Sequence, residues 1–126
     1  MWKVQWNENT EKMVPSSAAL ESLLDNIHAK KKPILVEVET QHNGNSLTIG
    51  LGSSKSVLSY VSGSGDPPYY LSVGSNHLHE YIEYYYRGES SEIPLKNSIP
   101  IKKARMAMRE FLKSARMPCN ITWEKV

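Results

Sequence analysis

The sequence predicts an α+β domain, in which a mainly antiparallel sheet of five to seven strands carries two helices packed on one face. Two segments, one near each end, repeat apolar residues at helical spacing, and several short segments between them alternate like strands. The connections between these short segments are brief, as in antiparallel hairpins. No internal repeat or long linker divides the chain, so we expect residues 1–126 to form a single domain.

The first helix is predicted from Ser16 or Ser17 to Lys32. Either serine is suited to accept a hydrogen bond from the free amides of a first helical turn, and Pro33 cannot continue a helix. Apolar residues recur at i, i+3, i+4 and i+7, which predicts one buried stripe. The stripe consists of Leu20, Leu23, Leu24 and Ile27.

Strands are predicted after this helix. Asn43–Gly44 lies between two alternating segments and is a strong hairpin signal, and a further strand at 2–6 is left open. The expected strands cover residues 34–40, 47–52, 56–62, 69–74 and 78–87.

The strand at 78–87 contains four tyrosines within six positions. Period-two alternation divides its side chains between two faces. The mainly apolar face, expected to point to the core, holds Leu78, Ile82, Tyr84 and Tyr86. The face expected to meet solvent holds His79, Tyr81, Glu83, Tyr85 and Arg87.

The second helix is predicted within residues 99–118, with Pro100 in its first turn, and a last strand within 120–126. The helix has an apolar stripe and, nearly opposite to it, a basic stripe. The apolar stripe holds Ile101, Ala104, Met108, Phe111, Leu112 and Ala115. The basic stripe holds Lys102, Arg105, Arg109, Lys113 and Arg116.

Charge is distributed unevenly along the chain, although the net charge is only +2. Residues 33–95 carry two bases and seven acids, a balance of −5, whereas residues 96–126 carry eight bases and two acids, a balance of +6. A partner attracted to the middle of the chain should therefore be basic.

The sequence favours a chain that works in the cytoplasm. Cys119 is the single cysteine and cannot form an intrachain disulfide, and we expect it to be a small buried side chain before the last strand. No apolar run is long enough to span a bilayer, and the N-terminal residues lack the apolar region of a signal peptide.

Catalysis is not supported, because no convergent set of acid, base and nucleophile is visible. His77 and His79 share one face of a predicted strand, yet two ligands do not complete a metal site. Cys119 acting as a nucleophile with a distant histidine as its base is a weaker interpretation than a small buried side chain. We therefore predict no catalytic, cofactor-binding or metal residues, and no small-molecule substrate.

Nucleic-acid binding is the main alternative. The basic stripe of the second helix could follow phosphates, although such a stripe is more often the solvated face of an amphipathic helix. Tyr81 and Tyr85 could stack on bases, but Glu83 lies between them on the same face and would repel phosphates. A protein-binding surface fits better, because tyrosine gives large contact area at low entropy cost and carboxylates attract basic partners.

The last two thirds of the chain, roughly residues 45–126, resemble the immunity proteins of bacterial polymorphic toxin systems, in particular the class numbered first in that series. The matching motifs are Ser72-Val73-Gly74, Ile99-Pro100, Ala104 with Ala107, Glu110-Phe111-Leu112, Pro118 and Trp123-Glu124. One departure is the absence of a glycine between the helix and Pro118, where a left-handed cap would lie. The helix is then expected to run longer or to end without that cap.

The resemblance implies an antidote that binds the C-terminal toxin domain of a secreted effector and blocks it without catalysis. Toxins associated with this family include deaminases and nucleases that act on nucleic acid, and such enzymes carry basic clefts. Acidic and tyrosine side chains suit such a cleft. The residues that we expect on or beside the toxin-binding surface are Asp66, Tyr81, Glu83, Tyr85, Arg87, Glu89 and Glu92.

Overall fold

The computed structural model describes residues 1–7, 10–74 and 80–126, and it confirms the α+β class. The helices are α1 (Ser17–Ala29) and α2 (Ile101–Ser114), with a short 3-10 turn at Leu95–Asn97. The longer strands are β1 (Trp2–Asn7), β2 (Thr10–Val14), β3 (Ile34–Thr40), β4 (Ser46–Leu51), β6 (Leu58–Val61), β8 (Tyr81–Tyr86) and β9 (Glu89–Pro94). The shorter strands are β5 (Lys55–Ser56), β7 (Tyr70–Ser72), β10 (Ile99–Pro100) and β11 (Trp123–Lys125).

One large sheet organises the part of the chain that is described. It has nine strands, seven of them in the order β11-β7-β6-β4-β3-β1-β2, while β8 pairs with β3 and β9 pairs with β8. Neighbours are antiparallel except β3 and β8, which meet in parallel. The sheet exceeds the expected five to seven strands because β2 and β9 were not predicted.

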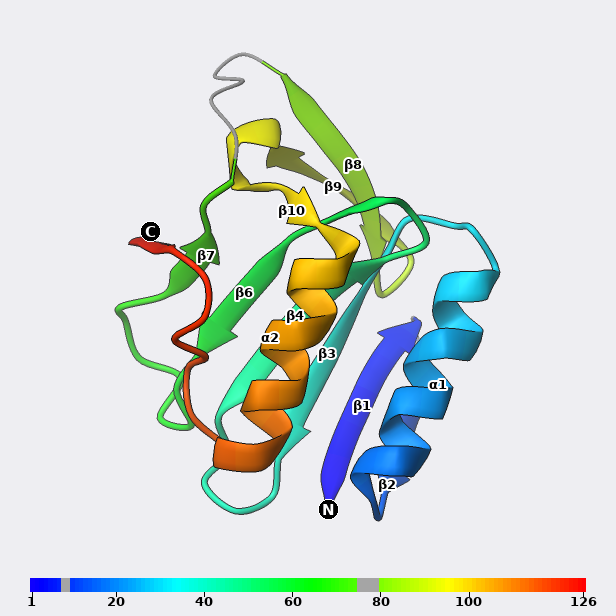
Figure 1. Ribbon diagram of the computed structural model, residues 1–126, viewed down its shortest axis with the longest axis vertical. Helices are drawn as coiled ribbons and strands as arrows, with labels where there is room; N and C mark the ends of the chain where they lie inside the picture. The colour runs from blue at the N-terminus through cyan, green and yellow to red at the C-terminus, as the bar shows by residue number, and fades with distance from the viewer. Residues whose placement is uncertain (8–9, 75–79) are drawn as a thin grey trace.

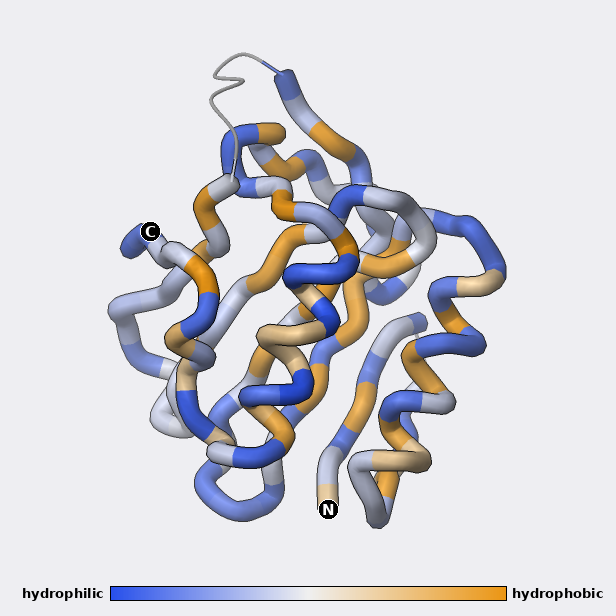
Figure 2. Tube along the Cα trace, in the orientation of Figure 1, coloured by the Kyte–Doolittle hydropathy of each residue, from blue (hydrophilic) through white to orange (hydrophobic). Residues whose placement is uncertain are grey.

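Both helices lie on the same face of the sheet, as predicted (Figure 1). Apolar side chains of the strands and of the helices form the main core between these layers. Figure 2 shows hydrophobic positions recurring along the strands and helices that enclose this core. Leu20 and Leu24 of α1 and Phe111 of α2 are fully buried there, together with Val36 and Ile49 of the sheet. The apolar stripes read from the sequence are therefore the surfaces that form the main core.

The boundaries of α1 follow from its capping. The Ser16 hydroxyl accepts a hydrogen bond from the Ala19 backbone N–H at 3.1 Å, as predicted for an N-cap serine. The helix ends at Ala29, earlier than the predicted Lys32, and Lys31 adopts a left-handed φ of 55°. The basic run therefore belongs to the connection to β3 and not to the last helical turn.

The end of α2 corrects one expectation. Ala115 occupies the left-handed cap with a φ of 57°, so the cap is present although glycine is absent. Its N–H donates to the Phe111 carbonyl at 2.8 Å, and its own carbonyl accepts the side-chain amides of Asn43 and Asn45 at 3.0 and 2.8 Å. The turn between β3 and β4 thus supplies hydrogen bonds that stabilise an alanine in a conformation usually taken by glycine.

Candidate functional site

A two-residue turn joins β8 to β9 and makes them a hairpin. Both turn residues, Arg87 with a φ of 51° and Gly88 with a φ of 87°, lie in the left-handed region, which is characteristic of a type I′ turn. Tyr86 pairs with Glu89 beside the turn, and the antiparallel register continues along the whole of β9. The twist of this turn matches the twist of its strands, so the hairpin has a defined shape.

Tyr84 attaches the hairpin to the main sheet. Its side chain is fully buried against Leu35 and Val57, on the sheet face opposite to the helices. Its ring lies over Gly50, where an added methyl group would meet ring carbons at 2.7 Å. Its hydroxyl donates to the Lys55 carbonyl at 3.0 Å, and burial raises the pKa of this phenol to about 12. The predicted inward face is confirmed for Ile82, Tyr84 and Tyr86, which form a second apolar cluster separate from the main core, while Leu78 lies outside the described residues.

Two further contacts hold the turn end of the hairpin near β3. The Tyr86 hydroxyl donates to Glu37 Oε2 at 3.0 Å. Burial, followed by the negative charge of Glu37, raises the pKa of Tyr86. The Tyr85 backbone N–H donates to the Pro33 carbonyl at 2.9 Å, where β8 meets β3 through the pair Ile34 and Tyr85. The hairpin is therefore positioned by backbone and side-chain bonds together.

The outward face of the hairpin carries exposed phenols and carboxylates. Tyr81 and Tyr85 are 61% and 46% exposed, and Glu83 lies between them on the same face. Glu92 is the direct cross-strand partner of Glu83. Like charges in this position are destabilising, and neither carboxylate has an ion pair within the described ranges. No ion pair among the described residues therefore offsets the repulsion between these two carboxylates.

The other three residues predicted for this surface are not all on that face. Arg87 is exposed in the turn at the end of the hairpin. Glu89 is exposed but pairs with Tyr86, so it belongs to the opposite side of the hairpin from Glu83. Asp66 is exposed in the connection between β6 and β7, which lies apart from the hairpin in Figure 1. The structure therefore brings together Tyr81, Glu83, Tyr85 and Glu92, with Arg87 at their edge.

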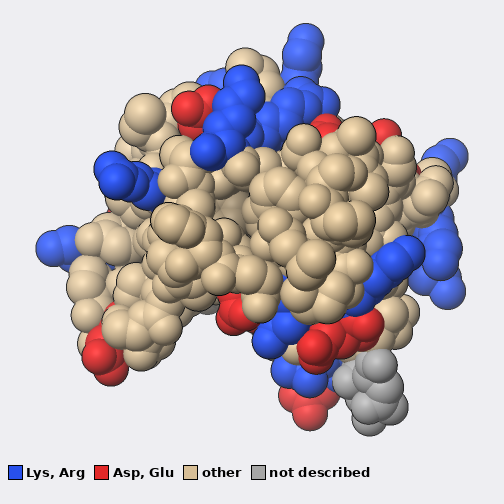
Figure 3. Space-filling view, turned by 90° about the horizontal axis from the view of Figure 1, so that it is seen from below, with Lys and Arg blue, Asp and Glu red and all other residues tan. Residues whose placement is uncertain are grey.

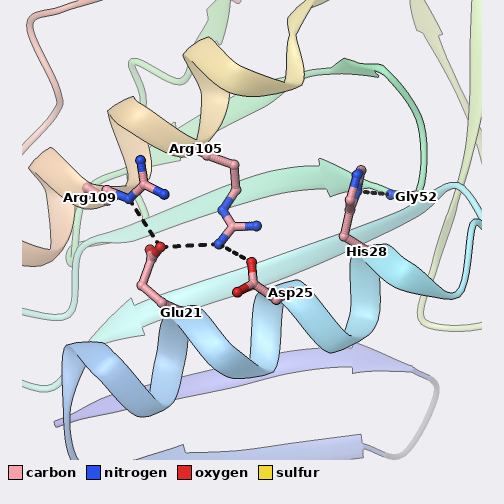
Figure 4. A network of polar contacts seen from close by, with 6 residues as sticks. All are labelled: Glu21, Asp25, His28, Gly52, Arg105 and Arg109. Carbon is pink, nitrogen blue, oxygen red and sulfur yellow. Dashed lines mark hydrogen bonds and ion pairs between the residues drawn. The ribbon is translucent and has the colours of Figure 1, made fainter.

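The basic stripe of α2 is partly used inside the molecule. Arg105 Nη2 lies 3.2 Å from Glu21 Oε2 and 2.8 Å from Asp25 Oδ1, and Arg109 Nε lies 3.1 Å from the same Glu21 oxygen (Figure 4). The Arg105 side chain is only 11% exposed. Nearby, His28 Nδ1 accepts the Gly52 backbone N–H at 2.9 Å. These bonds join α1 to α2 and to the connection after β4.

The remaining cations of the stripe, Lys102, Lys113 and Arg116, are exposed and make no ion pair with any described residue. Seen from below, lysine and arginine side chains gather along the upper margin of the molecule with carboxylates beside them (Figure 3). Two of the five predicted phosphate contacts are thus committed to carboxylates of α1. This arrangement weakens the case for nucleic-acid binding.

Groups that could support catalysis do not assemble among the described residues. His77 and His79 lie outside the described ranges. No group of three or more histidine, cysteine or acidic side chains suited to a metal ion occurs within those ranges. Cys119 is exposed, contrary to the expected burial, because Pro118 takes the buried position beside it and accepts the Trp123 indole N–H at 2.7 Å.

A cavity of about 760 Å³ opens between the start of α2 and the segment before β11. Lys55 and Lys103 line it together with Ile99, Cys119 and Asn120. The two lysines would repel a basic partner, so the cavity is a poor match for the partner that the acidic hairpin attracts. No helix within the described part of the chain is long and apolar enough to cross a membrane.

Sequence reasoning missed the residues that position the hairpin. Gly50 interrupts the apolar pattern of β4, and an isolated glycine within a strand is a known sign of close approach by another group. Glu37 is half-buried and accepts the Tyr86 hydroxyl, which the alternation of β3 alone does not indicate. The sequence of β9 does not predict a strand, because Glu, Ser and Pro have low strand propensity.

Comparison with known proteins gives one positive result. No curated protein matches the chain. A family model described as immunity protein Imm1 matches residues 8–125, nearly the whole chain. The match extends the resemblance beyond the tail motifs to β2, α1 and β3, and leaves β1 outside it. Since this match covers far more than half of the sequence, the chain belongs to the Imm1 immunity protein family, and its role is toxin-neutralising immunity.

Proposed function

We propose that the chain binds the C-terminal toxin domain of a secreted effector in the cytoplasm, one to one, and blocks it without catalysing a reaction. The toxin is proposed to act on nucleic acid as a deaminase or nuclease. An enzyme of this kind needs a basic cleft because its substrate is an anion. An acidic surface with phenol groups can occupy such a cleft, because carboxylates replace phosphates and rings pack where bases lie.

The outward face of the β8–β9 hairpin is the proposed contact surface. The pair formed by Glu83 and Glu92 is the observation that carries this proposal, since two adjacent carboxylates without a described cation lower stability unless a partner neutralises them. Tyr81 and Tyr85 beside them have the rigid, amphipathic character of interface hot spots. Arg87, Glu89 and Asp66 are proposed to contribute at the margins of this surface.

Rigid support of this surface favours tight binding. Tyr84 and Tyr86 anchor the hairpin from its inner side, so the outward groups are held in place before the partner arrives. Binding then costs less conformational entropy than ordering a loose loop would cost. The hairpin is also attractive at long range, because residues 80–94 include four acids and one base, a balance of −3.

The proposal is tested by isothermal titration calorimetry with the toxin domain encoded by the gene immediately upstream. The double variant Glu83→Ala, Tyr85→Ala should bind at least about tenfold more weakly than the wild-type chain, because both an anchor and a charge are removed. The matched control is Glu110→Ala, since Glu110 is an exposed carboxylate on α2. Unchanged affinity of a folded double variant would reject this placement of the surface.

The alternative function, nucleic-acid binding, is tested by a separate measurement. Binding of the chain to generic DNA or RNA that weakens steeply with added salt would favour it, because phosphate contacts release counterions. We expect no measurable binding, since Arg105 and Arg109 are already paired with Glu21.

A further inference from the structure

No described residue pairs with the outer edge of β9. Within the described ranges β9 pairs with β8 and with no other strand. Ser90 and Glu92 are both exposed. No described residue outside the hairpin forms a hydrogen bond with the backbone N–H or C=O group of either residue. An edge of this kind is a template on which another chain can add a strand.

The hydrogen-bonding register shows which groups are free. The Leu95 N–H donates to the Glu80 carbonyl at 2.8 Å, so this position is a hydrogen-bonded pair, and such pairs alternate along an antiparallel ladder. Counting from there, the backbone groups of Ser90 and Glu92 point away from β8. The Tyr85 N–H confirms the alternation, because it leaves the hairpin and donates to Pro33 at 2.9 Å. Two donors and two acceptors are therefore available on the outer edge.

This edge lacks most of the usual protection. Natural edge strands are shielded by lysine, proline, bulges or a covering segment. In β9 the register from Glu89 to Pro94 is regular, and the one proline stands at the end, where it has no N–H to offer. Pro94 therefore limits the length of an added strand but leaves Ser90 and Glu92 open.

Charge selects the partner. The hairpin has a balance of −3, so an added strand opposite Glu92 is stabilised when it carries lysine or arginine. A second copy of this chain would place a second acidic hairpin against the first, and the carboxylates would repel each other. β2, an edge of the main sheet, is less selective because Glu11 and Lys12 are of opposite sign.

We propose that the toxin docks by adding a basic β-strand to the free edge of β9, next to the phenol and carboxylate face of the hairpin. This inference rests on the proposed function and specifies how the same partner is held. The main-chain bonds at Ser90 and Glu92 would give affinity, while Glu83, Glu92 and the exposed phenols would select a basic sequence.

Two substitutions at Ser90 distinguish the contribution of its backbone N–H to binding from that of its side-chain hydroxyl. Ser90→Pro removes the outward N–H but none of the N–H groups of the hairpin ladder, and proline is tolerated on edge strands where the N–H faces solvent. Ser90→Ala removes only the hydroxyl. In calorimetry with the toxin domain encoded upstream, Ser90→Pro should weaken binding at least about tenfold, whereas Ser90→Ala should stay within about twofold of the wild-type chain.

Amide hydrogen exchange of the wild-type chain provides a second test that needs no variant. The Ser90 and Glu92 amides should exchange at least about tenfold more slowly once the toxin domain is bound, because both become strand donors. Unchanged exchange at these amides, with wild-type affinity of Ser90→Pro, overturns strand addition. If the Glu83→Ala, Tyr85→Ala variant still loses affinity, the hairpin remains the binding surface and only the edge pairing is rejected. A wild-type chain that does not bind the toxin rejects both proposals.

Discussion

The ring of Tyr84 on β8 occupies the space in which a side chain on Gly50 of β4 would lie. A methyl group on Gly50 would lie 2.7 Å from two ring atoms and 3.0 Å from the hydroxyl oxygen. The buried ring cannot move aside without leaving its cluster or its bond to the Lys55 carbonyl. The absence of a side chain at Gly50 therefore sets the position of Tyr84 and of the hairpin that carries the proposed binding face.

Replacing Gly50 by alanine should destabilise the protein by about 1–3 kcal/mol, because the new methyl group overpacks a buried contact. Urea unfolding measures the change. In a Tyr84→Ala background the same Gly50→Ala substitution should cost much less, since the obstructing ring is absent. Equal costs in both backgrounds would show that the two residues are not coupled. The single variant should also bind the toxin more weakly, because its hairpin is displaced.

The buried phenol of Tyr84 predicts a loss of stability at high pH. Burial raises its pKa from 10.0 to about 12 in the folded chain, so folding favours the neutral phenol. This contribution is fully present below pH 10 and disappears as the pH rises from 10 toward 12, because the unfolded chain then releases the proton more readily. Ultraviolet titration of the seven tyrosines should show one phenolate that forms last.

The Tyr84→Phe variant is the check on that assignment. It should lack the last step of the titration and lose stability less steeply above pH 10. At neutral pH it should be less stable by about 1 kcal/mol, because the Lys55 carbonyl loses its donor. Tyr81→Phe serves as the matched control, since that phenol is 61% exposed. A last titration step that survives in Tyr84→Phe would assign the raised pKa to another residue.

The elements that the sequence predicts well are those whose pattern coincides with one buried face. Leu20, Leu24 and Ile27 fix the inner side of α1, and alternation within β8 correctly separates buried Tyr84 from exposed Tyr85. β9 could not be predicted in this way, because it forms a strand through pairing with β8 across a tight turn and not through the propensity of its own residues. Local propensity is a weak guide where a neighbouring strand supplies the hydrogen bonds.

The candidate surface was predictable only within one strand. Tyr81, Glu83 and Tyr85 follow from alternation, since side chains two residues apart share a face. Glu92 joins them only through the register of the hairpin, and Glu89 is excluded by that same register. The separate position of Asp66 depends on tertiary structure. Charge totals identified an acidic region of the chain, but contacts between strands decide which acids act together.

Arg105 should be important for stability and unimportant for binding. Its guanidinium is largely buried between Glu21 and Asp25, so Arg105→Ala leaves Glu21, which is itself partly buried, with fewer donors. We expect a loss of about 2 kcal/mol in urea unfolding, because the partly buried Glu21 then keeps only Arg109 as a partner. Lys102→Ala, at an exposed position of the same helix, should change stability by less than about 0.5 kcal/mol.

Toxin affinity distinguishes this role from a binding role. The folded Arg105→Ala variant should bind the toxin as the wild-type chain does, since α1 and α2 lie on the sheet face opposite to the cluster that anchors the hairpin. A large loss of affinity without a loss of stability would contradict the structural assignment of Arg105 and direct attention to the helices.

The left-handed conformation of Ala115 predicts a stabilising substitution. Ala115→Gly should raise the free energy of unfolding by about 1 kcal/mol, because glycine adopts a φ of 57° without the steric cost that alanine has there. The same change at Ala19, an exposed position within α1, should destabilise by about 1 kcal/mol, since glycine there loses more conformational freedom on folding. If urea unfolding shows that alanine-to-glycine stabilises the protein at position 115 and destabilises it at position 19, the left-handed cap at Ala115 is established. A destabilised Ala115→Gly variant would contradict this expectation, because the substitution leaves the Ala115 carbonyl and its bonds from Asn43 and Asn45 in place.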